Sequence, residues 1–407
     1  MSKPMNQAYQ WPEAGERRLP RFIYTDEAIF AREMERIFFA DSWNYVALSC
    51  ELPNPGDYIL SSIGNVGVVV SRDRKGEVRV FVNRCPHRGA RLCERRKGNN
   101  KLFTCPYHEW SFNLEGRLVG VPLSRGVDGK GGMSEQFDPS AHHLQQLHVA
   151  QRHGVIFASF SNTIAPLTDY FGPKILKYFD RVCDGRPLKV IGKHKHVVYG
   201  NWKLQIENVK DTVHAAILHA FFTLFGIWRS DQKTQIVVEA NGRHSVLAST
   251  ATFTKQEGSS STTANGEFQL ADERLIAHSP EFQEATGAVM TLWPNLIFLQ
   301  QLNCLVMRHV EPVNSNSCIK TWTFFAYADE ASELTERRIK QANLLGAAGL
   351  VTIDDNEILA SCQQGIAYPQ DFQCVLEAGE GNGDCDYMVS ESAIRGFYQY
   401  YRQVMEL

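Results

Sequence analysis

Two short stretches carry most of the information in this chain: R-C-P-H-R-G-A at residues 84–90 and C-P-Y-H-E-W at residues 105–110. Each holds one thiol and one imidazole, Cys85 with His87 and Cys105 with His108, and 17 residues (88 to 104) separate His87 from Cys105. Because thiolates and imidazoles are common metal ligands, the paired loops predict a metal centre. Two kinds of centre take four such ligands: a tetrahedral zinc ion and an iron–sulfur cluster.

The distribution of the ligands separates these two possibilities. Zinc fingers usually pair Cys with Cys and His with His, whereas each loop here mixes the two types. In a Rieske centre, two Cys hold one iron of a [2Fe–2S] cluster and two His hold the other, which suits this arrangement. Pro86 and Pro106 stiffen the two loops. The pattern therefore favours a Rieske [2Fe–2S] cluster, with a structural zinc site as the alternative.

A second group of potential ligands lies in E-N-V-K-D-T-V-H-A-A-I-L-H, residues 207–219. His214 and His219 interrupt an apolar, helix-like run, and two His with one carboxylate form the facial triad of non-haem Fe(II) oxygenases. At about 100° per residue, a separation of five places two side chains roughly 140° apart on a regular helix. Both imidazoles therefore reach one metal only if the helix bends or ends between them. Hydrogen-bonded core histidines are the alternative.

Together, C-P-H-R-G, C-P-Y-H and the two-His run resemble the large (α) subunits of Rieske non-haem iron aromatic ring-hydroxylating oxygenases, and the resemblance covers nearly the whole chain. It implies one [2Fe–2S] cluster and one mononuclear Fe(II) per chain. Four further stretches are similar to the large subunits of salicylate 5-hydroxylase, terephthalate dioxygenase and anthranilate dioxygenase: E-L-P-N-P-G-D-Y (51–58), G-N-W-K-L-Q-I-E-N-V-K-D (200–211), R-R-I-K-Q-A-N-L-L-G-A-A-G (337–349) and S-A-I-R-G-F-Y (392–398).

The resemblance also implies roles for two carboxylates. It makes Asp355, the second Asp of T-I-D-D-N-E, the carboxylate ligand of the mononuclear iron. Taken alone, Asp354 and Asp355 are more typical of a solvated or N-capping pair ahead of a helix over residues 356–364. The resemblance further implies that Asp211 is the catalytic bridge, hydrogen-bonded between a cluster His of one subunit and an iron His of its neighbour. A carboxylate in that position fixes the tautomer of a metal-bound imidazole.

Substrate contacts are harder to find, because pocket residues look like ordinary core. Arg308, in L-N-C-L-V-M-R-H-V, and Arg395, in S-A-I-R-G-F-Y, place guanidinium groups in apolar runs and need anionic partners if buried. Arginine binds planar carboxylates through two parallel bonds, and the resemblance to terephthalate-type enzymes favours a benzoate-type substrate at one or both. Ion pairs within the fold are the alternative. Apolar substrate-binding candidates are Leu218, Leu247, Leu302 and Leu345, with Ile217 and Phe222.

Composition favours an enzyme that acts on neither nucleic acids nor membranes. The 407 residues carry a formal net charge of −3, and no run approaches the ~18 apolar residues of a membrane span. The N-terminus lacks the apolar stretch of a signal peptide, and the ten cysteines are not spaced as a disulfide framework. A cytoplasmic location is therefore expected.

The resemblance implies protein partners as well. Electrons from NAD(P)H are expected to arrive through a separate ferredoxin or reductase, because the chain shows no flavin or dinucleotide fingerprint. A bridge between neighbouring subunits implies a trimer, either α3 or α3β3 with a small β subunit.

Secondary-structure patterns predict an α+β fold. A helix at about residues 26–40 belongs to an N-terminal segment, 1–40, and alternating β-formers with G-N and K-G turns then predict a small all-β Rieske domain over 41–160. Residues 161–407 are expected to form the mononuclear iron domain, with an antiparallel sheet flanked by helices. The Ser/Gly-rich stretch 256–267 is expected to be a surface loop.

The sequence therefore predicts a terminal oxygenase that uses O2 and NAD(P)H-derived electrons to hydroxylate or cis-dihydroxylate the ring of an aromatic carboxylate of the salicylate, anthranilate or terephthalate type. A carnitine-type or demethylating oxygenase of a non-ring substrate would share both metal motifs. A Rieske electron carrier without oxygenase activity is the alternative from another class.

Overall fold

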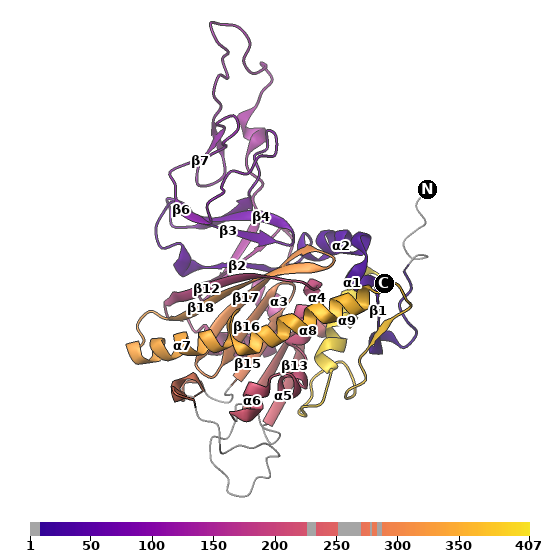
Figure 1. Cartoon of the computed structure of the whole chain (residues 1–407). Coiled ribbons are helices and arrows are strands. Elements are labelled where there is room, and N and C mark those ends of the chain that lie inside the picture. Colours follow the sequence, from indigo (N-terminus) through magenta and orange to yellow (C-terminus); the bar gives the residue numbers. More distant parts are fainter. Residues whose placement is uncertain (1–8, 226–232, 251–269, 277–278, 283–286) are drawn as a thin grey trace, which may run out of the picture. The chain divides into compact units, whose positions relative to one another are not determined.

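The structure is a computed structural model (Figure 1). It describes residues 9–225, 233–250, 270–276, 279–282 and 287–407. The expected surface loop at 256–267 lies outside the described residues. These form two compact units, one over Phe38–Ile164 and one that combines the residues up to Ile37 with Ala165–Leu407.

The unit over Phe38–Ile164 is built from short antiparallel strands. The predicted G-N turn joins β3 to β4 and the K-G turn joins β4 to β5, with Gly64 and Gly76 at φ +53° and +87°, where glycine carries no steric cost. Three sheets have the orders β5-β4-β3-β6, β7-β8-β9 and β10-β11-β2. Their strands are β2 (Asn44–Leu48), β3 (Asp57–Ile63), β4 (Val66–Arg72), β5 (Val78–Val82), β6 (Lys97–Asn99), β7 (Phe103–Thr104), β8 (Ser111–Phe112), β9 (Leu118–Gly120), β10 (His148–Arg152) and β11 (Val155–Ser159).

The predicted N-terminal helix is present, but only its first part is α-helical. Helix α2 spans Glu27–Glu33 and continues as a π-helical turn, Met34–Phe38. Asp26 caps it, because its Oδ1 accepts the N–H groups of Ala28 at 2.8 Å and Ile29 at 3.1 Å. The residues up to Ile37 pack with the C-terminal part of the chain.

A seven-stranded antiparallel sheet forms the centre of the other unit, in the order β12-β18-β17-β16-β15-β14-β13. All neighbouring strands pair antiparallel, so the sheet is a meander except for β12, which precedes the others in sequence and occupies the edge beside β18. The strands are β12 (Leu188–Val198), β13 (Lys233–Glu239), β14 (His244–Thr250), β15 (Gly287–Leu292), β16 (Leu296–Gln301), β17 (Cys304–Asn314) and β18 (Ser317–Tyr327).

Helices α7 (Ser332–Leu345) and α8 (Leu350–Ala367) lie across one face of this sheet (Figure 1). An apolar core between them includes Val306 and Phe324 of the sheet and Leu345 of α7. The remaining elements of the unit are β1 (Arg18–Pro20), α1 (Phe22–Thr25), α3 (Leu167–Val182), α4 (Trp202–Asn208), α5 (His214–Ile217), α6 (Ala220–Leu224), α7 (Ser332–Leu345), α8 (Leu350–Ala367), β19 (Gln373–Val375) and α9 (Ser392–Met405).

This architecture is the α+β fold that the sequence predicts, but one local interpretation was wrong. Helix α8 begins at Leu350, so Asp354 and Asp355 lie inside it and cannot cap a helix that starts at residue 356. Among the described residues, no helix has both the length and the apolar character needed to cross a membrane.

Candidate metal centres and active site

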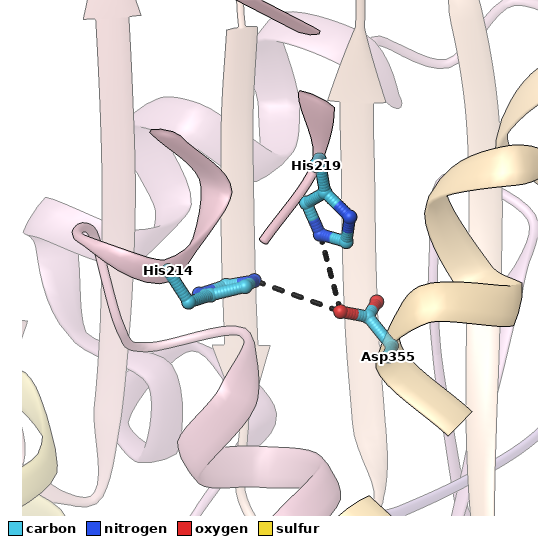
Figure 2. A group of neighbouring side chains, drawn as sticks. All are labelled: His214, His219 and Asp355. Atoms are coloured by element: carbon cyan, nitrogen blue, oxygen red, sulfur yellow. Dashed lines mark ion pairs between the residues drawn. The ribbon is translucent and has the colours of Figure 1, made fainter. Parts of the chain in front are cut away.

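Three potential metal ligands from two distant segments meet in the unit that holds the seven-stranded sheet. His214 begins α5, His219 follows that helix, and Asp355 lies in α8. Nε2 of His219 is 3.2 Å and Nε2 of His214 is 3.7 Å from Oδ1 of Asp355 (Figure 2). One donor atom from each of the three residues lies within 4.8 Å of the other two. This is the spacing of side chains that share one metal ion.

An interrupted helix allows the two imidazoles to converge. Helices α4, α5 and α6 are short and separate, as the five-residue spacing of His214 and His219 predicts. Asp211 shapes the turn before α5, because its Oδ1 accepts the N–H groups of Val213 at 2.7 Å and His214 at 3.3 Å. The two imidazole rings consequently lie edge to face, with centroids 5.3 Å apart.

Each imidazole is oriented through its second nitrogen. Nδ1 of His214 lies 3.0 Å from the backbone oxygen of Asp211, whose carboxylate Oδ2 is 4.0 Å away. Nδ1 of His219 lies 3.3 Å from Oδ2 of Asp354. Contacts of this kind hold a metal-binding imidazole in one tautomer and leave Nε2 free for the metal. Asp354 therefore supports the site, a role that the sequence did not indicate.

The carboxylate of Asp355 is buried but favoured in its charged form. Burial is the largest influence on its pKa and raises it, but the hydrogen bond to His219 and the positive charge of Lys320 outweigh burial and lower the pKa overall. The side-chain amide of Asn208, also missed by sequence reasoning, donates to Oδ1 of Asp355 at 3.1 Å. Burial lowers the pKa of His219, but its bonds to Asp355 and Asp354 outweigh this and raise it. Two imidazoles and one ionised carboxylate fit a mononuclear Fe(II).

The two Cys-plus-His loops share one backbone geometry. In each loop the Cys N–H donates to the carbonyl five positions on, at 2.8 Å for Cys85 and 2.9 Å for Cys105. The N–H four positions on, from Gly89 or Glu109, donates back to the Cys carbonyl at 2.9 or 3.0 Å. Both of these residues have positive φ, +76° and +56°. The loops are thus two equivalent, tightly hydrogen-bonded tips.

The side chains of these tips fit an iron–sulfur cluster. Cys85 and Cys105 are buried free thiols. The rings of His87 and His108 lie 4.6 Å apart, and Nδ1 of His108 is buried without a hydrogen-bond partner among the residues that the structure describes. Trp110 stacks on His87 at 4.7 Å and 4°. An orphaned imidazole nitrogen is costly unless a ligand takes it, as a cluster iron would.

A cavity of about 180 Å³ adjoins the three convergent ligands. Its described lining includes His214, His219 and Asp355, the guanidinium-bearing Arg308 from β17, and apolar side chains. The main apolar contributors are Val209, Phe222, Leu247, Val289, Leu299 and Val351. This combination is typical of a site for a small, largely apolar ligand with a few fixed polar contacts.

Arg308 is a buried cation facing this cavity. It is 5% exposed, and its guanidinium carbon lies 4.1 Å from the centroid of the Trp322 ring. Within the described part of the chain no carboxylate pairs with it, and its Nε is buried without a hydrogen-bond partner. Burial lowers its pKa to about 10, which keeps it charged at neutral pH. The negative charge of Asp355 offsets part of the effect of burial, but no described carboxylate is in ion-pair contact with the guanidinium, so a bound anion would be favourable there.

Arg395 has a structural role instead of the predicted carboxylate contact. Its guanidinium donates to four backbone carbonyls at 2.9 to 3.2 Å, from Leu376, Ala378, Gly379 and Gly381. These bonds clamp the chain before α9 and occupy the donors of the side chain. Arg395 is also not among the described residues that line the cavity.

Of the apolar residues predicted to contact substrate, only some lie at the cavity. Leu247 lines the cavity, as does Phe222, whereas Leu218, Leu302 and Leu345 are not among its described lining residues. Leu345 packs in the core between α7 and the sheet. Leu302 occupies the turn between β16 and β17 at φ +54°. Ile217, at 77% exposure, faces away from the core.

Comparison with known families accounts for both sites. Residues 42–130 match the family described as Rieske [2Fe-2S] domain, and residues 186–407 match the ring hydroxylating alpha subunit (catalytic domain) family. These matches define the class of protein: an oxidoreductase with a [2Fe–2S] domain and a mononuclear iron domain in one chain. Cluster rather than zinc is therefore the cofactor of the first domain.

Three similar proteins are all large subunits of ring hydroxylases or dioxygenases. The chain is 42% identical to the salicylate 5-hydroxylase large oxygenase component of Ralstonia sp., over 97% of this chain and 96% of that protein. It is 39% identical to an anthranilate 1,2-dioxygenase large subunit of Burkholderia cepacia (95% and 93%) and 36% identical to a terephthalate 1,2-dioxygenase alpha subunit of Comamonas sp. (97% and 97%). The resemblance read from the motifs is confirmed.

A solved structure shows the same fold. Naphthalene 1,2-dioxygenase from Rhodococcus sp., bound to indole, matches with a TM-score of 0.78 and 25% identity, covering 95% of this chain and 94% of that one. The chain thus belongs to the α subunits of Rieske ring-hydroxylating oxygenases.

Proposed function

We propose that the chain is a terminal oxygenase component that hydroxylates or cis-dihydroxylates the ring of an aromatic carboxylate, of the salicylate, anthranilate or terephthalate type. The observation that carries the substrate class is Arg308, a buried cation without an ion-pair contact to any described carboxylate, in the cavity beside the proposed iron ligands. The names of the relatives at 36–42% identity point to the same class.

Arg308 is suited to hold a carboxylate in a defined orientation. Trp322 lies against the guanidinium at 4.1 Å and restricts its plane, so the N–H fork is preformed. A carboxylate bound through two parallel bonds would neutralise the buried charge and fix the attached ring beside His214 and His219. Cavity volume and apolar lining limit water in the same space.

The site residues are assigned as follows. Cys85, Cys105, His87 and His108 would hold the cluster, and His214, His219 and Asp355 would hold the mononuclear iron. When bound, the cluster supplies single electrons and the iron supplies O2 activation. The chain's own contribution is to keep Asp355 ionised, to present Nε2 of both imidazoles, and to position the ring.

Asp211 is proposed to carry electrons between neighbouring subunits by bridging a cluster His and His214. In support, its Oδ1 is used within its own turn, while Oδ2 accepts no hydrogen bond from any described residue and the side chain is 32% exposed. A free carboxylate oxygen beside His214 is available to an imidazole from outside. This assignment requires a trimer, α3 or α3β3 with a small β subunit.

Electrons are proposed to come from NAD(P)H through a separate ferredoxin or reductase, in the cytoplasm, where NAD(P)H is available. We also propose functional boundaries at 41–160 for the Rieske domain and 161–407 for the catalytic domain. The N-terminal segment, 1–40, contributes to the catalytic unit, because the residues up to Ile37 pack there.

The test is product formation. Anaerobic enzyme is incubated with a panel of benzoates, reduced by a reductase or a chemical donor, exposed to O2 and analysed for hydroxylated or dihydrodiol products. Carnitine and a methoxylated acid represent the non-ring alternative. An electron carrier would contain the cluster alone, whereas the oxygenase should contain about three iron atoms per chain. Absence of any ring product from all acids would contradict the proposal.

A further inference from the structure

Lys210 is a costly residue for its place in the fold. It belongs to the turn between α4 and α5 and is 1% exposed. Among the described residues no carboxylate forms an ion pair with its amino group. Burial lowers the pKa of Lys210 to about 7 from 10.5, which reflects the cost of keeping the charged form there. An apolar side chain of similar length would fill the same space without this cost.

The amino group of Lys210 is attached to the central sheet through two hydroxyl groups. Its Nζ donates to Oγ of Ser245 at 2.6 Å and to Oγ1 of Thr291 at 2.6 Å. The two hydroxyls lie 2.7 Å apart and hydrogen-bond each other. Ser245 and Thr291 are buried residues that pair across β14 and β15. The three groups therefore form a closed ring of hydrogen bonds, which persists if Nζ loses its charge, because a neutral amine still carries two hydrogens.

This attachment lies next to the apolar wall of the cavity. Side chains two residues apart on a strand point to the same face of a sheet. Ser245 therefore shares a face with Leu247, and Thr291 shares it with Val289. Leu247 and Val289 also pair across the two strands, and both line the cavity. The side chain of Lys210 consequently fastens its turn to the sheet face that bounds the site.

A second attachment holds the same turn from its other side. The hydroxyl of Thr212 donates to the backbone carbonyl of Met388, in the segment before α9. Lys210 and Thr212 thus fix the residues on either side of Asp211 to the interior of the protein. The side chain of Asp211 itself is 32% exposed, and its Oδ1 is bound within the turn. This arrangement presents Oδ2 of Asp211 outward from a turn that is fastened at both neighbours.

The outward presentation of Asp211 matters for the bridge between imidazoles. A carboxylate that bridges two groups must stay within hydrogen-bonding distance of both, and a misplacement of about 1 Å costs on the order of 100-fold in rate. Functional groups are held to this precision when their supports end on rigid elements. Lys210 is such a support, because its long side chain ends on two paired strands in the middle of the seven-stranded sheet.

We propose that Lys210 is a positioning residue for electron transfer between subunits: its bonds to Ser245 and Thr291 hold the turn in which the Asp211 carboxylate bridges two imidazoles. The inference rests on the bridging role of Asp211 in the proposed function and extends it. Lys210 acts through Asp211 and is not itself a catalytic residue. Its replacement should leave both metals in place and slow the passage of an electron from the cluster to the iron.

The test is a double-mutant cycle on the holoenzyme. Lys210→Met, which keeps a long side chain but removes its hydrogen bonds, is made in the wild type and in Asp211→Asn. Each protein is reduced anaerobically, given salicylate, anthranilate or terephthalate in turn, and mixed with O2 while the oxidation of the cluster is followed by its absorbance. Iron content, the Rieske EPR signal and unfolding by denaturant are measured on the same samples.

The two backgrounds should respond differently. In the wild type, Lys210→Met should slow cluster oxidation by about tenfold, the usual size of effect for a group that supports a metal-site residue. In Asp211→Asn the further slowing should be less than about twofold, because the residue through which Lys210 acts has already lost its charge. Iron content and the EPR signal should match the parent protein. Lys195→Met, on the edge strand β12, controls for the loss of a lysine from the same sheet.

Three results would overturn the inference: an unchanged rate in Lys210→Met while Asp211→Asn is slow, the same fold-slowing in both backgrounds, or loss of the mononuclear iron from Lys210→Met. A purely structural Lys210 would lower the free energy of unfolding and give the second of these results. If Lys210→Met does not fold, Thr291→Val removes one acceptor with little change of shape. It should slow cluster oxidation by about threefold, again only while Asp211 is present.

Failure of the proposed function would give a different pattern. Either Asp211→Asn would oxidise its cluster at the wild-type rate, or none of the three acids would support oxidation of the wild-type cluster by O2. Both results would contradict the proposed function directly, and the role of Lys210 would fall with it.

Discussion

The four proposed cluster ligands fall within 24 positions of the chain, 85 to 108, whereas the three proposed iron ligands span 214 to 355. The cluster ligands stand on two tips whose backbone bonds close within six residues. The iron ligands depend on an interrupted helix and a distant one, α8, brought together over a sheet. The cluster site, whose ligands are close in the chain, can therefore be predicted from a motif. The iron site, whose ligands come from distant segments, also depends on supporting contacts that the sequence does not reveal.

The largest effect is expected from removing a metal ligand, which should abolish one metal site and leave the other intact. Asp355→Ala removes the only carboxylate of the triad and should abolish hydroxylation and the mononuclear iron, while the Rieske EPR signal of the reduced protein persists. Cys105→Ala is the reciprocal variant and should lose the EPR signal. If Asp355→Ala retained full mononuclear iron by metal analysis, its assignment as a ligand would be wrong.

The second-largest effect is expected when electron transfer between the cluster and the iron is blocked. Asp211→Asn keeps the backbone carbonyl that orients His214, so both metals should remain bound. Product formation should fall by about 100-fold, because a neutral amide cannot replace the carboxylate as the hydrogen-bonded bridge between two imidazoles. Single-turnover oxidation of the prereduced cluster is the direct measurement. Turnover at the wild-type rate would refute the bridge.

The cavity beside the iron ligands should also distinguish charged from uncharged substrates. Arg308→Leu should reduce kcat/KM for an aromatic acid by about 30-fold, chiefly through KM, because a charge-assisted contact is lost. An uncharged arene of similar size should be affected far less. Arg308→Lys is the matched control: it keeps the charge but not the two-bonded geometry, and should give an intermediate loss. Equal effects on acid and arene would place Arg308 in a structural role.

A smaller effect is expected from the support behind His219. Asp354→Asn should weaken Fe(II) affinity by about tenfold, because the imidazole loses an anionic hydrogen-bond partner. Competition with a chelator of known affinity measures this directly. Glu357→Gln, on the same helix, is a suitable control for removing a negative charge. Unchanged iron affinity in Asp354→Asn would show that the 3.3 Å contact does not influence the metal site.

The smallest expected effect concerns stability of the scaffold around the iron site. Burial raises the pKa of Glu207 in α4 to about 7 from 4.5, while Tyr24 and Tyr398 donate to its Oε1. The folded state therefore holds an extra proton between those values. Stability from this group is complete below pH 4.5 and is lost as pH rises through 7, by up to about 3 kcal/mol.

Glu207→Gln should remove this contribution to the pH dependence. Denaturant unfolding of wild type and variant at pH 5 and pH 7.5 gives the difference, in which titration of other groups cancels. The wild type should lose stability relative to the variant as pH rises. A difference that is independent of pH would show that Glu207 titrates normally.

Predictions succeeded where a single segment contains the information. The interruption between His214 and His219 follows from helical geometry, and the Gly turns between β3, β4 and β5 follow from local backbone preference. Predictions failed where a partner comes from elsewhere. Arg308 and Arg395 look alike in sequence, yet four backbone carbonyls surround Arg395 and no described carboxylate pairs with Arg308.

The amino-acid sequence by itself determined the metal chemistry, because ligand types and their short spacings restrict which metals can bind, and it determined the α+β class through its hydrophobic periodicities. Only the tertiary structure decided which groups support and surround the iron site: Asn208 and Asp354 behind the ligands, and Arg308 in the lining of the cavity. The physical reason is that strand register and helix packing bring together residues whose separation in the chain carries no information about their contact.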